Sequence, residues 1–118
     1  MRDRDLLELA AKAAGIEIDW ELGFARFARL PKHDKMNPAV GWWNPLANDG
    51  DALRLAVKLK IHISGFFDKV TTDTDERSFC ENYGADPLAA TRRAIVRAAA
   101  EIGKASSNAQ LPGGLEAV

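Results

Sequence analysis

The sequence has a single cysteine, Cys80, and only two histidines, His33 and His62. One cysteine cannot form an intramolecular disulfide, and one cysteine with two histidines is too small a set for a zinc site. A lone cysteine in a predicted strand is more typical of a small filler or surface residue than of a nucleophile. We therefore expect a fold held together without disulfides or metal, and no cofactor.

Long apolar runs and an excess of one charge are also missing. No stretch approaches the roughly 18 apolar residues of a membrane span, and 16 basic residues nearly balance 17 acidic ones. A net charge of -1 argues against strong attraction to nucleic acid or to an anionic membrane. The charged start Met1-Arg2-Asp3-Arg4-Asp5 lacks the apolar core of a secretory signal. We expect a soluble, cytoplasmic protein with no membrane partner.

Composition and capping signals predict one domain with three helices. The 118 residues are 47% apolar and 28% charged, as in globular domains. We place the domain at residues 1–103 and a flexible tail, rich in Ser, Asn, Gln, Pro and Gly, at 104–118. Helices are expected where a capping side chain precedes an apolar repeat. They cover about residues 4–14 (cap Asp3, stop Gly15), 49–59 (cap Asn48, with Asp51 in the capping-box position) and 87–102 (cap Asp86, stop Gly103).

Apolar spacing predicts the buried face of the last two helices. For the second helix this face is Ala52, Leu53, Ala56, Val57 and Leu59; for the third it is Leu88, Thr91, Ile95, Ala98, Ala99 and Ile102, with Val96 and Ala100 on other faces.

Alternating apolar residues predict the strands. They lie at about residues 16–20, 24–29, 61–64, 68–72 and 77–83, the last two forming a hairpin around Asp73-Thr74-Asp75-Glu76. Residues 30–41 show neither periodicity and are predicted to be a loop. The fold class is α+β: an antiparallel sheet of about four to five strands packed with three helices.

Two adjacent tryptophans, Trp42 and Trp43, stand with Asn44 directly before the second helix. One interpretation buries at least one indole as a loop anchor. Another leaves one ring face open, as a platform on which a base or a partner side chain could stack. Nearby guanidinium groups could then bind phosphate, and the candidates are Arg54, Lys58, Arg92, Arg93 and Arg97. These basic residues could equally form solvated helix faces.

Three blocks of sequence carry a resemblance to a known family. They are Asp3-Arg4-Asp5-Leu6-Leu7-Glu8-Leu9 with its continuation to Ile16, Trp43-Asn44-Pro45-Leu46 with residues 49–59, and residues 85–100. Together they resemble the phage ABA-sandwich domain of small bacteriophage and prophage proteins, and more distantly NinX-type phage proteins. The resemblance covers about residues 1–103. It implies a helix-sheet-helix sandwich of phage origin acting in the host bacterial cytoplasm, and it supplies no catalytic motif.

The leading functional hypothesis is a non-enzymatic phage accessory protein. It would bind a host protein or sequester a small, nucleotide-like signal, and it could form a homodimer. The first alternative is a nucleic-acid-binding protein that uses the Trp and Arg surface. The second is a small metal-dependent hydrolase built on Asp49, Asp51 and His62, although two carboxylates at a helix start are more often caps.

Overall fold

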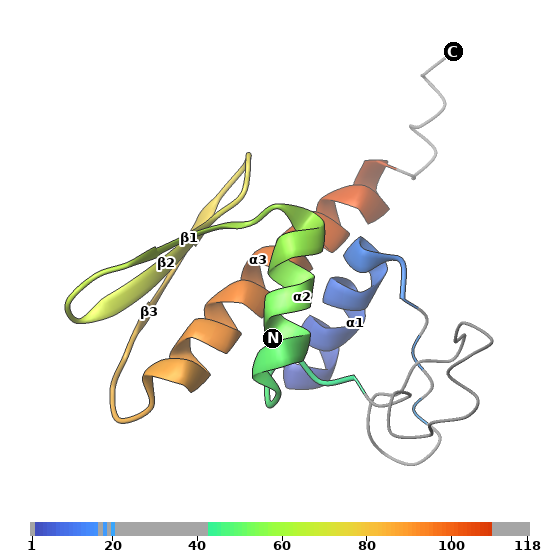
Figure 1. Ribbon diagram of the computed structural model, residues 1–118. Helices are drawn as coiled ribbons and strands as arrows, with labels where there is room; N and C mark the ends of the chain where they lie inside the picture. The colour runs from blue at the N-terminus through green and yellow to red at the C-terminus, as the bar shows by residue number, and fades with distance from the viewer. Residues whose placement is uncertain (1, 17, 19, 21–42, 110–118) are drawn as a thin grey trace.

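The computed structural model describes residues 2–16, 18, 20 and 43–109. In chain order the elements are α1 (Asp3–Ala14), α2 (Asp49–Leu59), β1 (His62–Gly65), β2 (Lys69–Asp73), β3 (Ser78–Asn82) and α3 (Pro87–Ala109) (Figure 1). The α+β class is confirmed, and the described residues form three helices and one antiparallel sheet. The sheet of the described residues has three strands rather than four or five. Of the predicted strand at 16–20, Ile18 makes a single β-bridge, and the predicted strand at 24–29 lies outside the described residues.

The strands follow each other in the order β1-β2-β3, each antiparallel to the next. The predicted β2–β3 hairpin is confirmed. Its turn is closed by Thr74, whose backbone N donates to the carbonyl of Arg77 at 2.9 Å and whose hydroxyl accepts from the backbone N of Glu76 and Arg77. A threonine that accepts bonds from the following backbone in this way fixes a short turn locally.

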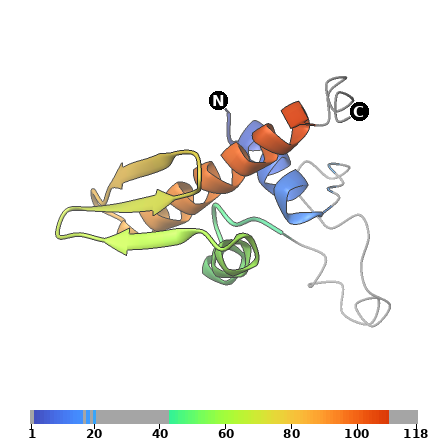
Figure 2. The same ribbon diagram turned by 90° about the horizontal axis from the view of Figure 1, so that it is seen from above.

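Helix α3 is the central element of the molecule. Val70, Thr72 and Phe79 on one face of the sheet are buried, and the Thr72 hydroxyl donates to the carbonyl of Ala94 in α3 at 2.8 Å. Helix α1 packs along α3 on the side away from the sheet, and α2 packs beside it (Figures 1 and 2). The described layers therefore run sheet, α3, α1, and not helix-sheet-helix, because the described helices all lie on one side of the sheet.

This central position explains why the predicted face of α3 was too narrow. Val96 and Ala100, expected on other faces, are as buried as Ile95 and Ala99. A helix with a sheet on one side and a second helix on the other buries residues all round. Leu88, placed in the predicted core, is 61% exposed because it lies in the first turn, ahead of the buried section.

Gly103 does not end α3 as predicted. The helix continues to Ala109, so residues 104–109 are helical. A Cβ added at Gly103 would lie 2.0 Å from the carbonyl oxygen of Leu9 in α1. Glycine is thus needed here for close helix approach rather than for a stop.

The start of α2 is as predicted, but its buried face is not. The side chain of Asn48 accepts from the backbone N of Asp51 at 2.8 Å, which confirms the N-cap. The helix buries Asp51, Ala52, Leu55 and Ala56 against its neighbours. Leu53 and Val57, assigned to the core from sequence, are 60% and 68% exposed.

The cap predicted for α1 is also wrong. Asp3 is already the first helical residue, and the N-cap is Arg2, which makes no side-chain capping bond.

Candidate functional site

The corner before α2 is a structural anchor. Trp43 is only 4% exposed and belongs to the core, so its ring offers no open stacking face. The backbone N of Asn44 donates to the Asp51 carboxylate at 2.9 Å, and the Asn44 side chain accepts from the backbone N of Leu46. These bonds tie the corner to the first turn of α2. Trp42 lies outside the described residues.

The basic residues singled out from sequence do not gather at this corner as one surface. Arg54 is paired with Asp51 at 2.8 Å, and Lys58 is exposed on α2. Arg92 donates to the carbonyl of Leu46 and to Asp49, which fastens the start of α2 to α3. Arg93 and Arg97 lie on another side of α3.

The residues of the hydrolase hypothesis do not converge. Asp49 and Asp51 open α2, whereas His62 lies beyond its other end. At a rise of 1.5 Å per residue, the 11-residue helix α2 is about 16 Å long, and the two aspartates and His62 lie at its opposite ends. Asp49 is engaged by Arg92 at 2.6 Å. Within the described part of the chain, no three His, Cys, Asp or Glu side chains could hold a metal ion.

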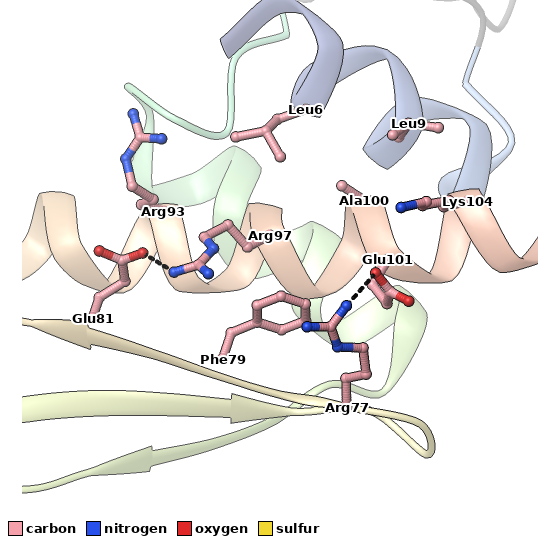
Figure 3. Close-up of a pocket in the computed structure, with 10 residues that line it drawn as sticks. All are labelled: Leu6, Leu9, Arg77, Phe79, Glu81, Arg93, Arg97, Ala100, Glu101 and Lys104. Atoms are coloured by element: carbon pink, nitrogen blue, oxygen red, sulfur yellow. Dashed lines mark hydrogen bonds and ion pairs between the residues drawn. The ribbon is translucent and has the colours of Figure 1, made fainter. Parts of the chain in front are cut away.

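A groove of about 440 Å³ lies between α1, α3 and β3 (Figure 3). Its size falls within the range of small-molecule sites. Its lining consists of Leu6, Leu9, Arg77, Phe79, Glu81, Arg93, Arg97, Ala100, Glu101 and Lys104. Arg93 and Arg97 were candidates from sequence, whereas the other charged residues and Phe79 were not.

Two periodicities build this groove. Arg77, which directly precedes β3, and Phe79 and Glu81 within it are two residues apart and share the inner face of the strand, because side chains two apart point to the same side. Arg93 and Arg97 lie one turn apart on α3, and the row continues through Glu101 and Lys104. Both rows are visible in the sequence, but their meeting depends on how β3 packs over α3.

The charges in the groove are organised around Phe79. The guanidinium carbons of Arg97 and Arg77 lie 5.0 and 5.4 Å from its ring centroid, within cation–π range. Arg97 is ion-paired with Glu81, and Arg77 with Glu101 at 3.6 Å (Figure 3).

Positive charge outweighs negative charge in the lining. Arg93 is paired with Asp3 at 3.0 Å, and Lys104 is exposed and has no ion-pair partner among the described residues. Four basic and two acidic side chains line the groove, which leaves an excess of two positive charges in a chain whose net charge is -1.

A second groove, of about 640 Å³, has the opposite character. It lies between the start of β1, the β2–β3 turn and the last turns of α3, and Asp73, Asp75, Glu76 and Glu101 dominate its charge. Glu101 lines both grooves, and its ion pair with Arg77 lies where they meet. The first groove differs from this one in being lined by arginines and a phenylalanine ring.

Comparison with protein-family models, curated proteins and solved structures finds no match for this chain. None of the described helices is long and apolar enough to cross a membrane.

Proposed function

We propose that this protein is a non-enzymatic binding module that holds a small anionic ligand with a planar apolar part, such as a nucleotide, in the groove between α1, α3 and β3. The observation that carries the proposal is the pair of guanidinium groups held beside Phe79, with Arg93 and Lys104 on the same groove. Planar guanidinium groups bind phosphate or carboxylate through paired hydrogen bonds. Leu6 and Leu9 supply apolar surface opposite them.

The ion pairs now present in the groove do not prevent such binding. The side chains of Arg77, Arg93 and Arg97 are 60%, 40% and 38% exposed, so each keeps access to solvent. Exposed ion pairs contribute only about 0–1 kcal/mol each. A ligand phosphate that makes charge-assisted bonds to two arginines can therefore replace their carboxylate partners at modest cost.

The biological setting we propose is that of a phage accessory protein in the host cytoplasm, which sequesters a host signal and so modulates host physiology or defence. This part rests on the resemblance of residues 3–16, 43–59 and 85–100 to the phage ABA-sandwich domain. The groove adds a chemical reason to favour a small anion over a host protein. It favours the anion over long nucleic acid as well, because the basic side chains of α2 and α3 are divided between different surfaces.

Isothermal titration calorimetry tests the proposal. The panel comprises nucleoside monophosphates, cyclic nucleotides, the matching unphosphorylated nucleosides and inorganic phosphate. We expect at least one nucleotide to bind more tightly than both its nucleoside and phosphate alone, because only the nucleotide uses the basic side chains and the apolar surface together. Host lysate analysed by native mass spectrometry extends the panel to other anions.

Substitutions assign the binding to the groove. Arg77→Gln and Arg97→Gln should each weaken binding about tenfold, the equivalent of one lost charged hydrogen bond. Arg54→Gln is the matched control, since Arg54 is 73% exposed and lies outside the groove. Absence of binding across the panel and the lysate, or equal loss in the control, would count against the proposed function.

A further inference from the structure

The outer edge of β1 carries backbone groups that face away from the sheet. Hydrogen bonds from Phe66 N to Lys69 O and from Thr74 N to Arg77 O fix which residues of each strand point toward which neighbour. With His62 opposite Asp73 and Ser64 opposite Thr71, these two residues of β1 bond to β2. The N–H and C=O groups of Ile63 and Gly65 therefore point the other way, and no described strand pairs with them. Exposed edges of this kind are templates for pairing with another chain.

We infer that this edge pairs with the same edge of a second copy of the chain. An antiparallel pair centred on Ser64 places Ile63 of one copy opposite Gly65 of the other, and the reverse. Both residues then exchange their outward N–H and C=O groups, as the narrow pairs of an antiparallel ladder require. The two three-stranded sheets become one sheet of six strands related by a two-fold axis, which is the commonest symmetry of protein dimers.

Charges at the ends of this register are complementary. Pairing outward from Ser64 brings His62 of one copy opposite Phe66 of the other. Beyond this pair the chain leaves the strand, and Lys60 at the C-cap of α2 lies at the same end of the ladder as Asp68 in the β1–β2 turn of the other copy. Lys60 and Asp68 are both exposed, so they are available for an ion pair. The two-fold axis places these opposite charges at both ends of the ladder, and no like charges face each other within the paired residues 62–66. The sequence of the edge is thus suited to its own copy.

Exposed apolar side chains lie at the same two ends. Phe67, at the tip of the β1–β2 hairpin, is 101% exposed, and Phe66 beside it is 51% exposed. The hairpin tip of one copy meets the end of α2 in the other, where Val57, 68% exposed, lies one turn before Lys60. Pairing of the copies would cover these side chains, which a monomer leaves in water.

This interface is independent of the ligand groove. The groove is lined by β3, the strand at the opposite edge of the sheet. A protein that binds no ligand could therefore still dimerise, and a protein that stays monomeric could still bind a ligand in the groove.

Sedimentation equilibrium across micromolar to millimolar concentrations tests the inference on the full chain. We expect reversible monomer–dimer exchange, with dimerisation weakened at least about tenfold by Phe67→Ser, since each dimer loses two buried rings. Lys60→Glu should weaken it about tenfold by placing like charges together, and Lys60→Glu with Asp68→Lys should restore it. Asp75→Lys is a charge reversal of the same size and opposite sign in the other hairpin, and it should have no effect.

Amide hydrogen exchange gives a second measurement that needs no variant. The amides of Ile63 and Gly65 should become protected as concentration rises, whereas that of Ser64, already bonded to β2, should change little. A monomer at every concentration would overturn the inference. So would a dimer that Phe67→Ser and Lys60→Glu leave unchanged, because it would use another surface.

Discussion

Replacement of Gly103 by alanine gives the sharpest test of the packing between α1 and α3. On helix propensity alone, Gly→Ala inside a helix should stabilise the protein by about 1 kcal/mol. The structure predicts the opposite sign. The new Cβ would lie 2.0 Å from the Leu9 carbonyl oxygen and 2.8 Å from its carbon, whereas Cβ contacts under 3.0 Å essentially do not occur.

The size of the effect follows from what must move. The atoms in contact are backbone on both helices, so α1 must shift by about 1 Å away from α3 at this crossing. Overpacking of this kind typically costs about 1–3 kcal/mol and can cost more. When the propensity gain of about 1 kcal/mol is subtracted from a packing cost of about 3 kcal/mol, the net loss in the free energy of unfolding is about 2 kcal/mol. For a domain of this size we expect a melting temperature about 8 °C lower.

Urea and thermal unfolding followed by circular dichroism measure this change. Gly50→Ala in α2 is the control, because its nearest neighbours are side-chain atoms of Arg54 and Asn48 at 3.2 Å, and a shift of only a few tenths of an ångström relieves that contact. We expect the control to change stability by no more than about 0.5 kcal/mol. A Gly103→Ala protein as stable as the wild type would refute the close approach of α1 and α3.

Two further substitutions test how α3 holds its neighbours. Arg92→Lys should lower the free energy of unfolding, measured in urea, by about 1–2 kcal/mol, because an ammonium group cannot replace the planar guanidinium that bonds to both Leu46 and Asp49. Arg93→Lys, in a more exposed ion pair, should lower it by well under half as much. Thr72→Val should lower the free energy of unfolding by about 1 kcal/mol, because the buried hydrogen bond from its hydroxyl to α3 is lost. Equal losses for the two arginine variants would contradict the role of Arg92, and an unchanged stability of Thr72→Val would contradict that of Thr72.

Local signals in the sequence predicted the elements well where the interacting residues are close together in the chain. The Asn48 cap, the β2–β3 hairpin and the start of α3 at Pro87 all depend on residues a few positions apart. The buried face of α2 was predicted less well. Leu53 and Val57 are apolar, but α2 buries Leu55 instead. Which side of an amphipathic helix faces inward depends on its neighbours, and periodicity alone could not choose.

Only the α3 side of the candidate site was predicted from the sequence. Arg93 and Arg97 stood out as a basic row on a helix, but their partners on β3 come from a separate part of the chain. The row Arg77-Ser78-Phe79-Cys80-Glu81 has the alternation of a strand with a charged and aromatic inner face, which is the one signal that could have identified them. Trp43, the residue most conspicuous in the sequence, proved to be an interior anchor.

The burial of α3 on opposing sides also bears on insertions and deletions. One residue added or removed within residues 94–100 would rotate everything beyond it by about 100°. Side chains fitted to the sheet would then turn toward other neighbours, and Gly103 would leave its position beneath Leu9. The hairpin turns can absorb changes in length, but the middle of α3 cannot, so its length is fixed by both of the layers that it separates.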